Sequence, residues 1–305
     1  MKYDSLIAPP SKKIRLKNYD PGDTAHFRNE EEALASLSEE STALAKYQDI
    51  LMAHETYGML ILFQAMDGAG KDGTIKQVLS GLDPQGCEVK MFKKPTEKEV
   101  RHDYLWRALG SIPARGQMGI FNRSYYENVI ADRIHPEHLD QQRLQEERKG
   151  KGIWEKQYRH INNFEQYLFD EGIVVLKFFL QMSKDKQVER LLERITLPEK
   201  KWKFSGSDLD EREHWAEYMK VYEEVFSHTS TEVAPWHIIP DDHRWFARSA
   251  IASIIVDKLK SLHSKYPALD DEQARELEKA RRKLTQERPS IRKRADRGGK
   301  GQKKS

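Results

Sequence analysis

A continuous apolar segment followed at once by a small-residue turn constrains this chain more than any other feature. Residues 59–65 (MLILFQA) are almost all apolar, which is typical of a strand buried on both faces of a parallel sheet. Residues 66–74 (MDGAGKDGT) form a glycine-rich turn that leads into a helical segment. This order predicts a phosphate-binding loop, because small residues let backbone N–H groups and a helix N-terminus surround an anion.

The turn carries one lysine, Lys71, for which a tight strand-to-helix turn has little structural use. We expect Lys71 to contact the transferred phosphoryl group, although a turn without a ligand is the alternative. The other loop positions expected to bind phosphate or nucleotide are Gly68, Ala69, Gly70, Asp72, Gly73 and Thr74. Relative to G-x-x-x-x-G-K-[ST], Ala65 replaces the first glycine and Asp72 the hydroxyl residue that reaches Mg²⁺. Asp67 is therefore the expected metal ligand within the loop.

A second motif, GIFNRSYYE (residues 119–127), places a polar cluster at the end of the apolar residues 118–121. Ligands of open α/β sheets bind at such strand ends, so Asn122 or Glu127 could supply a metal oxygen and Arg123 could neutralise a transferring phosphoryl group. The structural alternative is a capping box with Ser124 as the cap and Glu127 at its third position. Both interpretations can hold together.

Short apolar segments alternate with helical segments along the chain, which predicts an α/β fold with a parallel sheet. The expected strands are residues 59–65, 88–92, 118–121, 173–180 and 236–239. The expected helices are residues 30–55, 74–82, 98–109, 124–133, 153–170, 184–194, 208–226 and 244–263.

A basic loop and an acidic helix between Arg190 and Tyr222 predict a lid over the phosphates, placed at about residues 194–228. A solvated hairpin is the alternative. The positive charges before the helix are Arg190, Arg194, Lys200, Lys201 and Lys203.

The two chain ends differ from the middle in composition. Residues 271–305 contain 13 Lys/Arg and 6 Asp/Glu, whereas the whole 305-residue chain has a net charge of only +3. We expect an irregular arm over residues 1–40, a catalytic domain over 41–265, and a basic tail over 266–305 that passes from helix into disorder. No apolar segment is long enough to span a bilayer, which predicts a cytoplasmic protein with no membrane partner.

Four ordered motifs make the chain resemble a family-2 polyphosphate kinase over roughly residues 45–262. The matching segments are QAMDGAGKDGTIKQVLSGLDPQG, HDYLWRALGSIPARGQMGIFNRSYYENVIADRIHPEHL, ERITLPEKKWKFSGSDLDEREHWAEYMKVYEE and APWHIIPDDHRWFAR. The resemblance implies a P-loop kinase-like fold with a central parallel sheet flanked by helices and a helical lid. It also implies reversible, Mg²⁺-dependent transfer of a terminal phosphoryl group between inorganic polyphosphate and ADP/ATP or AMP, with Mn²⁺ as a substitute, in a homodimer or homotetramer.

The resemblance places functional roles on Asp67, Lys71, Asn122, Arg123, Arg194 and Lys203, and we add Glu127 and Arg133 as further candidates. The expected catalytic residues are Asp67, Lys71, Asn122, Arg123 and Glu127, of which Asp67, Asn122 and Glu127 are the expected metal ligands. Outside the loop, the expected phosphate- or nucleotide-binding residues are Arg133, Arg194 and Lys203.

The acceptor range depends on residues 121–127. The motif FNRSYYE is similar to the corresponding motif in the branch of the family that accepts both AMP and ADP. Diphosphate-selective members have a motif that resembles FDRSWYN instead. Relative to the latter, a carboxylate has in effect moved from position 122 to position 127. Two other functions stay open at this point: an ATP-dependent nucleotide kinase of the thymidylate-kinase type, and a P-loop NTPase with a nucleic-acid-binding tail. No motif for specific nucleic-acid recognition supports the last one.

Overall fold

The computed structural model describes residues 3–142, 144, 145, 150 and 152–298. Within it, residues Met1–Lys265 form one compact unit and residues Tyr266–Ser305 a second. None of the helices among the described residues is long and apolar enough to cross a membrane.

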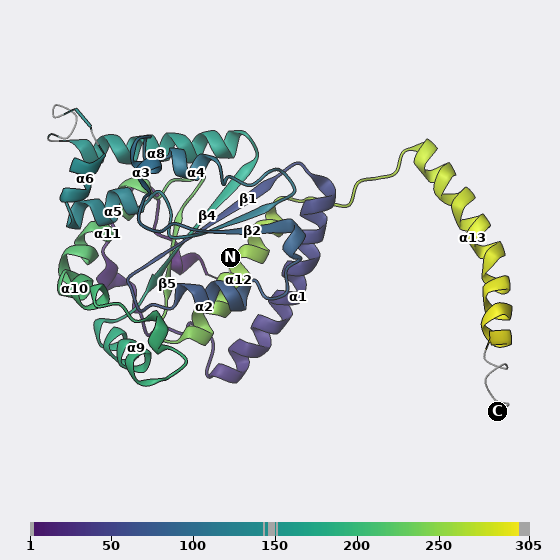
Figure 1. Cartoon of the computed structure of the whole chain (residues 1–305), viewed down its shortest axis with the longest axis horizontal. Helices are drawn as coiled ribbons and strands as arrows, with labels where there is room; N and C mark the ends of the chain where they lie inside the picture. The colour runs from purple at the N-terminus through teal and green to yellow at the C-terminus, as the bar shows by residue number, and fades with distance from the viewer. Residues whose placement is uncertain (1–2, 143, 146–149, 151, 299–305) are drawn as a thin grey trace. The chain divides into compact units, whose positions relative to one another are not determined.

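Five parallel strands form one sheet in the order β2-β3-β1-β4-β5 (Figure 1). Their bounds are Gly58–Ala65 (β1), Cys87–Met91 (β2), Met118–Asn122 (β3), Ile173–Gln181 (β4) and Trp236–Pro240 (β5). The α/β class and all five expected strands are confirmed. The chain continues from β3 on one side of β1 to β4 on the other, which makes the carboxyl end of β1 the place where such sheets bind ligands.

Helices cover both faces of the sheet (Figure 1). One face carries α1 (Glu30–His54), α2 (Lys71–Val78) and α12 (Arg244–Ser261). The other carries α5 (Glu127–Ile134), α8 (Ile153–Asp170) and α11 (Trp215–Thr229). The other α-helices described in this unit are α3 (Glu97–Val100), α4 (Trp106–Leu109), α6 (Glu137–Gln141), α9 (Lys184–Thr196) and α10 (Ser207–Glu213). A hydrophobic core lies on each face, so the central strands are buried on both sides.

Two of the expected helices are each divided into two shorter ones. Residues 98–109 form α3 and α4 around a turn in which the Asp103 carboxylate accepts the Leu105 N–H at 3.0 Å. Residues 208–226 form α10 and α11, which meet at His214. Apolar spacing alone does not reveal such breaks, because the same pattern continues across them.

The N-terminal segment belongs to the Met1–Lys265 unit and contains short 3₁₀ helices at Asp4–Leu6 and Leu16–Asn18. The Ala8 N–H donates to the Trp236 carbonyl at 2.8 Å. Helix α1 begins at Glu30, inside the segment expected to be an irregular arm, because the Asn29 side chain accepts the Glu32 N–H at 2.9 Å and caps it.

The C-terminal unit contains helix α13 (Asp271–Gly298). The basic tail is therefore helical over most of the segment in which we expected helix to pass into disorder. Residues 299–305 lie outside the described residues.

Candidate active site

The turn after β1 has the conformation of an anion-binding loop. Gly68 and Gly70 have φ of +88° and +87°, a backbone region that favours glycine, and α2 begins directly afterwards at Lys71. Lys71 is buried, and its ammonium group donates to the Ala65 carbonyl at 3.0 Å. Burial lowers the pKa of Lys71, and the nearby Arg123 lowers it further. The lysine is thus held at the loop with little freedom.

The turn after β3 lies beside this loop. Asn122 pairs with Phe63 in the sheet, and its side-chain amide donates to the Asp72 carboxylate at 2.7 Å. The expected capping box is absent from this turn, since α5 begins at Glu127 with no side-chain cap. The Ser124 hydroxyl instead accepts from the Gln64 side chain at 3.1 Å and from the Tyr126 N–H at 3.2 Å.

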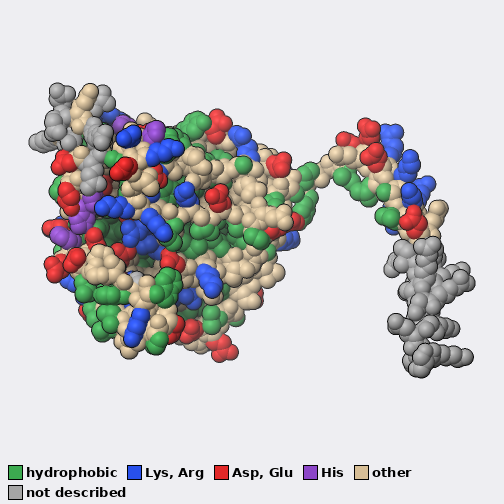
Figure 2. All heavy atoms as spheres, in the orientation of Figure 1, with side chains coloured by type: hydrophobic (Ala, Val, Ile, Leu, Met, Phe, Trp, Pro, Cys, Tyr) green, Lys and Arg blue, Asp and Glu red, His purple; other side chains and the backbone are tan. Residues whose placement is uncertain are grey.

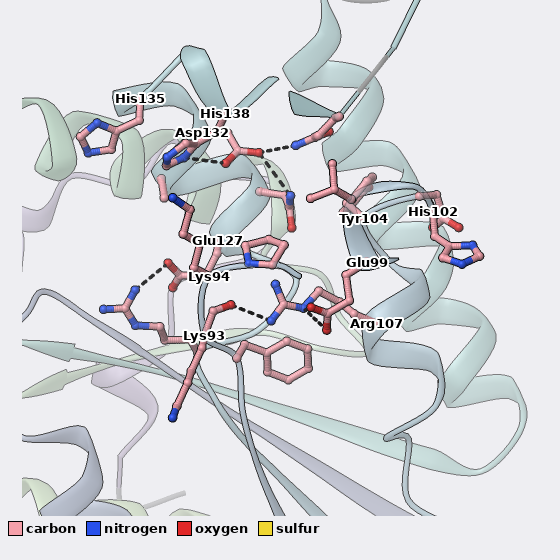
Figure 3. Close-up of a pocket in the computed structure, with 18 of the residues that line it drawn as sticks. Lys93, Lys94, Glu99, His102, Tyr104, Arg107, Glu127, Asp132, His135 and His138 are labelled. Carbon is pink, nitrogen blue, oxygen red and sulfur yellow. Dashed lines mark hydrogen bonds and ion pairs between the residues drawn. The ribbon is translucent and has the colours of Figure 1, made fainter. Parts of the chain in front are cut away.

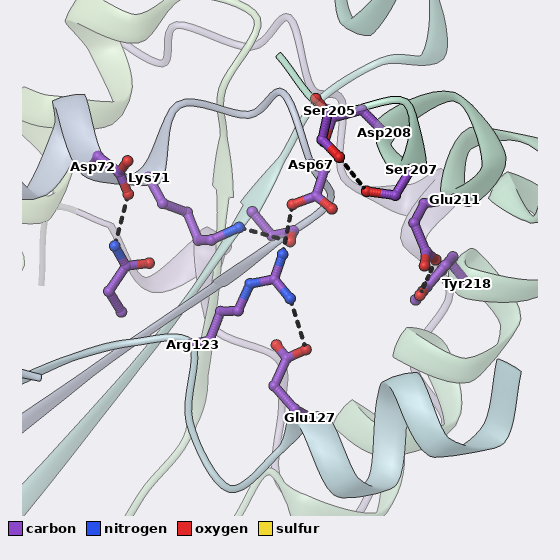
Figure 4. Close-up of polar contacts among 12 residues, drawn as sticks. Asp67, Lys71, Asp72, Arg123, Glu127, Ser205, Ser207, Asp208, Glu211 and Tyr218 are labelled. Carbon is purple, nitrogen blue, oxygen red and sulfur yellow. Dashed lines mark hydrogen bonds and ion pairs between the residues drawn. The ribbon is translucent and has the colours of Figure 1, made fainter. Parts of the chain in front are cut away.

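Arg123 is the centre of the charged groups between loop and turn (Figure 4). Its guanidinium donates to Asp67 at 2.7 Å and to Glu127 at 3.3 Å. The charge of Glu127, and to a smaller extent that of Asp67, raises the pKa of Arg123 although burial lowers it. Burial alone would raise the pKa of Asp67, but the charges of Arg123 and Lys71 outweigh it and hold that pKa below its ordinary value. Asp67 is therefore ionised at neutral pH.

A buried polar network supports this turn from below. The Lys177 ammonium group, fully buried in β4, donates to Glu165 at 2.5 Å and to the Tyr126 hydroxyl at 2.9 Å. The Tyr125 and Tyr126 hydroxyls each donate to the other Glu165 oxygen at 2.9 Å. Since a fully paired buried network is rigid, it fixes the turn that carries Arg123.

A large pocket lies over the loop, with a volume of about 760 Å³. We call it the loop pocket. Among the described residues, its basic lining consists of nine side chains: Lys71, Lys93, Lys94, Arg123, Arg190, Arg194, Lys200, Arg244 and Arg248. Its acidic lining is Asp67, Asp72 and Glu193. Such a surface attracts a polyanion.

A second pocket of about 500 Å³ extends along α5 (Figure 3). We call it the α5 pocket. It shares Asp67, Phe92, Lys93, Lys94 and Arg123 with the loop pocket. Farther along, Asp132 accepts from Gln142 at 2.6 Å and from Asn128 at 3.2 Å, and lies 3.4 Å from His138. Burial raises the pKa of Asp132 to about 6 despite the opposing charge of His138.

The segment expected to be a lid, residues 194–228, runs from the end of α9 through α10 into α11 and contributes residues to both pockets. Arg194 lines the loop pocket and donates to Asp208 of α10 at 2.6 Å. Glu211 of α10 lines the α5 pocket, where it contacts His135 at 3.0 Å and accepts from the Tyr218 hydroxyl.

Among the expected binding residues, Arg133 and the fully buried Ala69 and Thr74 do not line either pocket as far as the structure describes it, and the side chain of Lys203 is not described. Lys203 belongs to a 3₁₀ turn, Lys201–Lys203, and its side chain lies outside the described part of the structure. Arg133 donates to Tyr158 at 2.5 Å and to Glu224 at 2.7 Å, and it is not among the described residues that line either pocket. Its helix, α5, turns its other face to the α5 pocket.

Several pocket residues had no role in the sequence interpretation, above all Arg244 and Arg248 of α12. Their Nε atoms are buried and have no hydrogen-bond partner within the described residues. Burial lowers the pKa of Arg244, and the charge of Arg190 adds to this effect. The available signal was two arginines four residues apart on a helix that follows a strand end.

The candidate metal ligands differ in their surroundings. Asp67 supplies an ionised carboxylate at the junction of the pockets, whereas Arg123 lies between Asp67 and Glu127 and pairs with both (Figure 4). No group of three or more His, Cys, Asp or Glu suited to a metal occurs among the described residues. Because Mg²⁺ takes one or two protein carboxylates and completes its shell with phosphates and water, Asp67 fits this ion.

On the face drawn in Figure 2, a patch of Lys and Arg side chains lies beside a margin rich in His and acidic side chains. Fold and site together define a phosphotransferase with a P-loop. Comparison with known proteins identifies the family: residues 28–267 match the model of polyphosphate kinase 2, and the chain belongs to that family.

Two curated relatives are similar over most of their length. The chain is 46% identical to the ADP-polyphosphate phosphotransferase of Rhodopseudomonas palustris, covering 79% of this chain and 84% of the relative. It is 42% identical to the AMP/ADP-polyphosphate phosphotransferase of Meiothermus ruber, covering 85% and 93%. The crystal structure of polyphosphate kinase 2 from Arthrobacter aurescens superposes with a TM-score of 0.82 at 35% identity, covering 92% of this chain and 98% of that one.

The chain is thus a polyphosphate:nucleotide phosphotransferase, as the sequence motifs predicted. The two alternative functions, an ATP-dependent nucleotide kinase and a nucleic-acid-binding NTPase, are not supported by these relatives. The relatives differ in acceptor range, one being named for ADP and the other for AMP and ADP.

Proposed function

We propose that this protein transfers the terminal phosphoryl group of polyphosphate to both ADP and AMP. The donor chain occupies the loop pocket, and the acceptor nucleotide occupies the α5 pocket with its phosphates toward Arg123. One observation carries this assignment: the two pockets differ in charge but share Asp67 and Arg123 at their junction. A phosphoryl group bound at the junction would contact donor and acceptor sites together.

The residues at the junction act on charge and position. Lys71 and Arg123 stabilise negative charge on the phosphoryl group during transfer, which is the main contribution a protein makes to this chemistry. Both are held in place, Lys71 by the Ala65 carbonyl and Arg123 by Asp67 and Glu127. Because one phosphoanhydride bond is exchanged for another, the reaction runs in both directions.

A divalent cation completes this site. Asp67 would hold Mg²⁺, or Mn²⁺ in its place, and the ion would neutralise phosphate oxygens that the side chains do not reach. Asn122 contributes indirectly, since its amide nitrogen faces Asp72 and fixes that carboxylate. Glu127 contributes by orienting Arg123.

The assignment of AMP as an acceptor is tested with purified protein, Mg²⁺ and polyphosphate. With AMP as the sole nucleotide, ADP and then ATP should accumulate; a parallel reaction with ADP and no polyphosphate measures ADP disproportionation. Consumption of ADP but not AMP would restrict the protein to diphosphates.

The role of position 122 in acceptor choice is tested by exchanging residues. Asn122→Asp alone places a second carboxylate at hydrogen-bonding distance from Asp72, so it disturbs the loop for any acceptor. The double variant Asp72→Asn/Asn122→Asp restores an amide–carboxylate pair. If the charge at position 122 selects the acceptor, the double variant should lower kcat/KM for AMP about 5-fold more than for ADP, a difference of about 1 kcal/mol. Equal losses for AMP and ADP would contradict the selection.

A further inference from the structure

Two side chains of α9 hold the outer side of the phosphate-binding loop. The Gln187 amide donates to the Asp67 carbonyl at 2.7 Å, and Arg190 donates to the Ala69 carbonyl at 2.7 Å. Gln187 also packs against Gly68, where an added Cβ would lie 3.3 Å from its Cγ. With these carbonyls held by α9, other N–H groups of the loop can face the donor phosphates, while the Ala69 N–H donates to the Met66 carbonyl at 3.3 Å.

Arg190 and Gln187 differ in the residues that they contact on their other side. Arg190 is buried and pairs with Asp241 at 2.6 Å, directly after β5, so it ties the loop to the sheet. Gln187 is also buried, but its amide oxygen accepts from Arg212 of α10 at 2.6 Å. Arg212 donates further to the Lys184 carbonyl at 3.0 Å. The second contact therefore connects the loop to the lid.

Helix α10 has contacts in two directions. Ser207 and Glu211 line the α5 pocket, whereas Arg212 reaches Gln187. Arg212 does not belong to the described lining of either pocket. The side chain that Arg212 contacts toward the loop is Gln187, whereas the other link from α10 to the loop pocket, Asp208 with Arg194, does not involve Arg212.

We propose that Arg212 and Gln187 are positioning residues that couple the acceptor pocket to the donor loop. Movement of α10 on an occupied α5 pocket tightens the Arg212–Gln187–Asp67 chain and aligns the loop for the donor. By linkage, a bound donor favours acceptor binding to the same degree. This inference rests on the proposed placement of the acceptor in the α5 pocket.

The test is a double-mutant cycle with Arg212→Met, Gln187→Met and the combination. Each single variant should lower kcat/KM for polyphosphate about 10-fold at saturating ADP, and the combination should lose no more than either one. Calorimetric titration of polyphosphate in the absence of Mg²⁺, into nucleotide-free enzyme and into enzyme saturated with ADP, provides a binding readout: ADP should tighten polyphosphate binding in the wild type and no longer do so in the single variants. Arg212→Lys, which retains a donor, should recover most of the loss.

Lys186→Met is the matched control, since Lys186 is a half-buried cation of α9 whose ammonium group pairs with the exposed Glu189 at 2.6 Å, away from the Gln187 contacts. It should leave both readouts within about twofold. Should Gln187→Met fail to fold, Arg212→Met and Gln187→Glu, which keeps the acceptor for Arg212, take its place.

Two results would overturn the coupling: losses that multiply in the combination, or a lower Tm with unchanged donor binding and kcat/KM in Arg212→Met. The proposed acceptor placement fails separately, if Glu211→Gln leaves the KM for ADP unchanged while the Arg212 and Gln187 losses still do not multiply.

Discussion

The loop pocket and the α5 pocket meet at Arg123 but provide opposite electrostatic environments. Among described residues, the loop pocket is lined by nine Lys/Arg and three Asp/Glu, whereas the α5 pocket is lined by four Lys/Arg and six Asp/Glu together with three histidines. A surplus of cations suits a chain of identical phosphates. A mixed lining suits a molecule with phosphates at one end and a nucleoside at the other. With donor and acceptor placed as proposed, this difference in charge separates them.

The same contrast shows in two aspartates. In the loop, the charges of Arg123 and Lys71 outweigh burial and lower the pKa of Asp67. In the α5 pocket, burial prevails over His138 and raises the pKa of Asp132 to about 6. Asp67 therefore keeps its charge at neutral pH, whereas Asp132 gains a proton as the pH falls through about 6. Identical side chains thus serve different purposes because their neighbours differ.

Lys71→Ala should have the largest effect on activity of these variants, because it removes from the loop pocket the positive charge that is buried in the loop itself. We expect a loss in kcat of about 10²-fold or more, or about 2.7 kcal/mol, with unchanged circular dichroism. Steady-state assays with polyphosphate and ADP measure it. Near wild-type turnover in a folded variant would refute the role of the loop in catalysis.

Arg248→Met should separate the two pockets, since Arg248 lines only the loop pocket. We expect the KM for polyphosphate to rise about 10-fold and the dependence on salt to weaken, while the KM for ADP stays constant. Lys260→Met, an exposed cation on the same helix, is the control. A parallel rise in the KM for ADP would show that the pockets are not distinct in function.

Asp67→Asn should change the response to Mg²⁺, because an amide oxygen coordinates without a charge. The half-activating Mg²⁺ concentration should rise several-fold, about 5-fold as an order of magnitude, and excess Mg²⁺ should restore part of the rate. The variant also loses the ion pair with Arg123, so Glu127→Gln serves as a control that weakens Arg123 from its other side. If the dependence of the rate on Mg²⁺ stays unchanged, Asp67 does not bind the metal and serves only to hold Arg123 in place.

What the sequence predicts depends on how local the feature is. Strand, loop and helix are contiguous over residues 58–78, so Lys71 and Asp67 could be found from their order alone. Arg248 reaches the loop only because α12 packs beside α2, a neighbour far away in sequence. No local pattern shows that contact.

The sequence also does not show which face of a helix lines a pocket. Arg133 belongs to the same helix as Glu127, but it points to Tyr158 and Glu224. The sequence places a cation on α5 without showing which face meets the pocket, because both faces of α5 are partly polar. Only packing against α8 and α11 decides it.

The smallest expected effect concerns Asp132 and the pH dependence of the free energy of unfolding. It also allows the most direct comparison with Asp67. Its pKa lies near 6 in the folded protein and at 3.8 ordinarily, so the folded state binds its proton more tightly than the unfolded chain. The protonated group therefore favours folding, and this contribution is lost as pH rises through 6. Asp67 has the opposite sign, since its lowered pKa favours folding at higher pH and loses that contribution in acid.

Asp132→Asn isolates this contribution, because asparagine keeps the shape but does not titrate. Between pH 7 and pH 5, the wild type should gain about 1 kcal/mol of unfolding free energy relative to the variant. Urea unfolding at the two pH values measures the difference, and Asp140→Asn on the neighbouring helix α6 controls for the loss of an acidic group. A difference that stays constant with pH would mean that Asp132 remains ionised throughout, and the α5 pocket would then carry a full negative charge where the nucleoside binds.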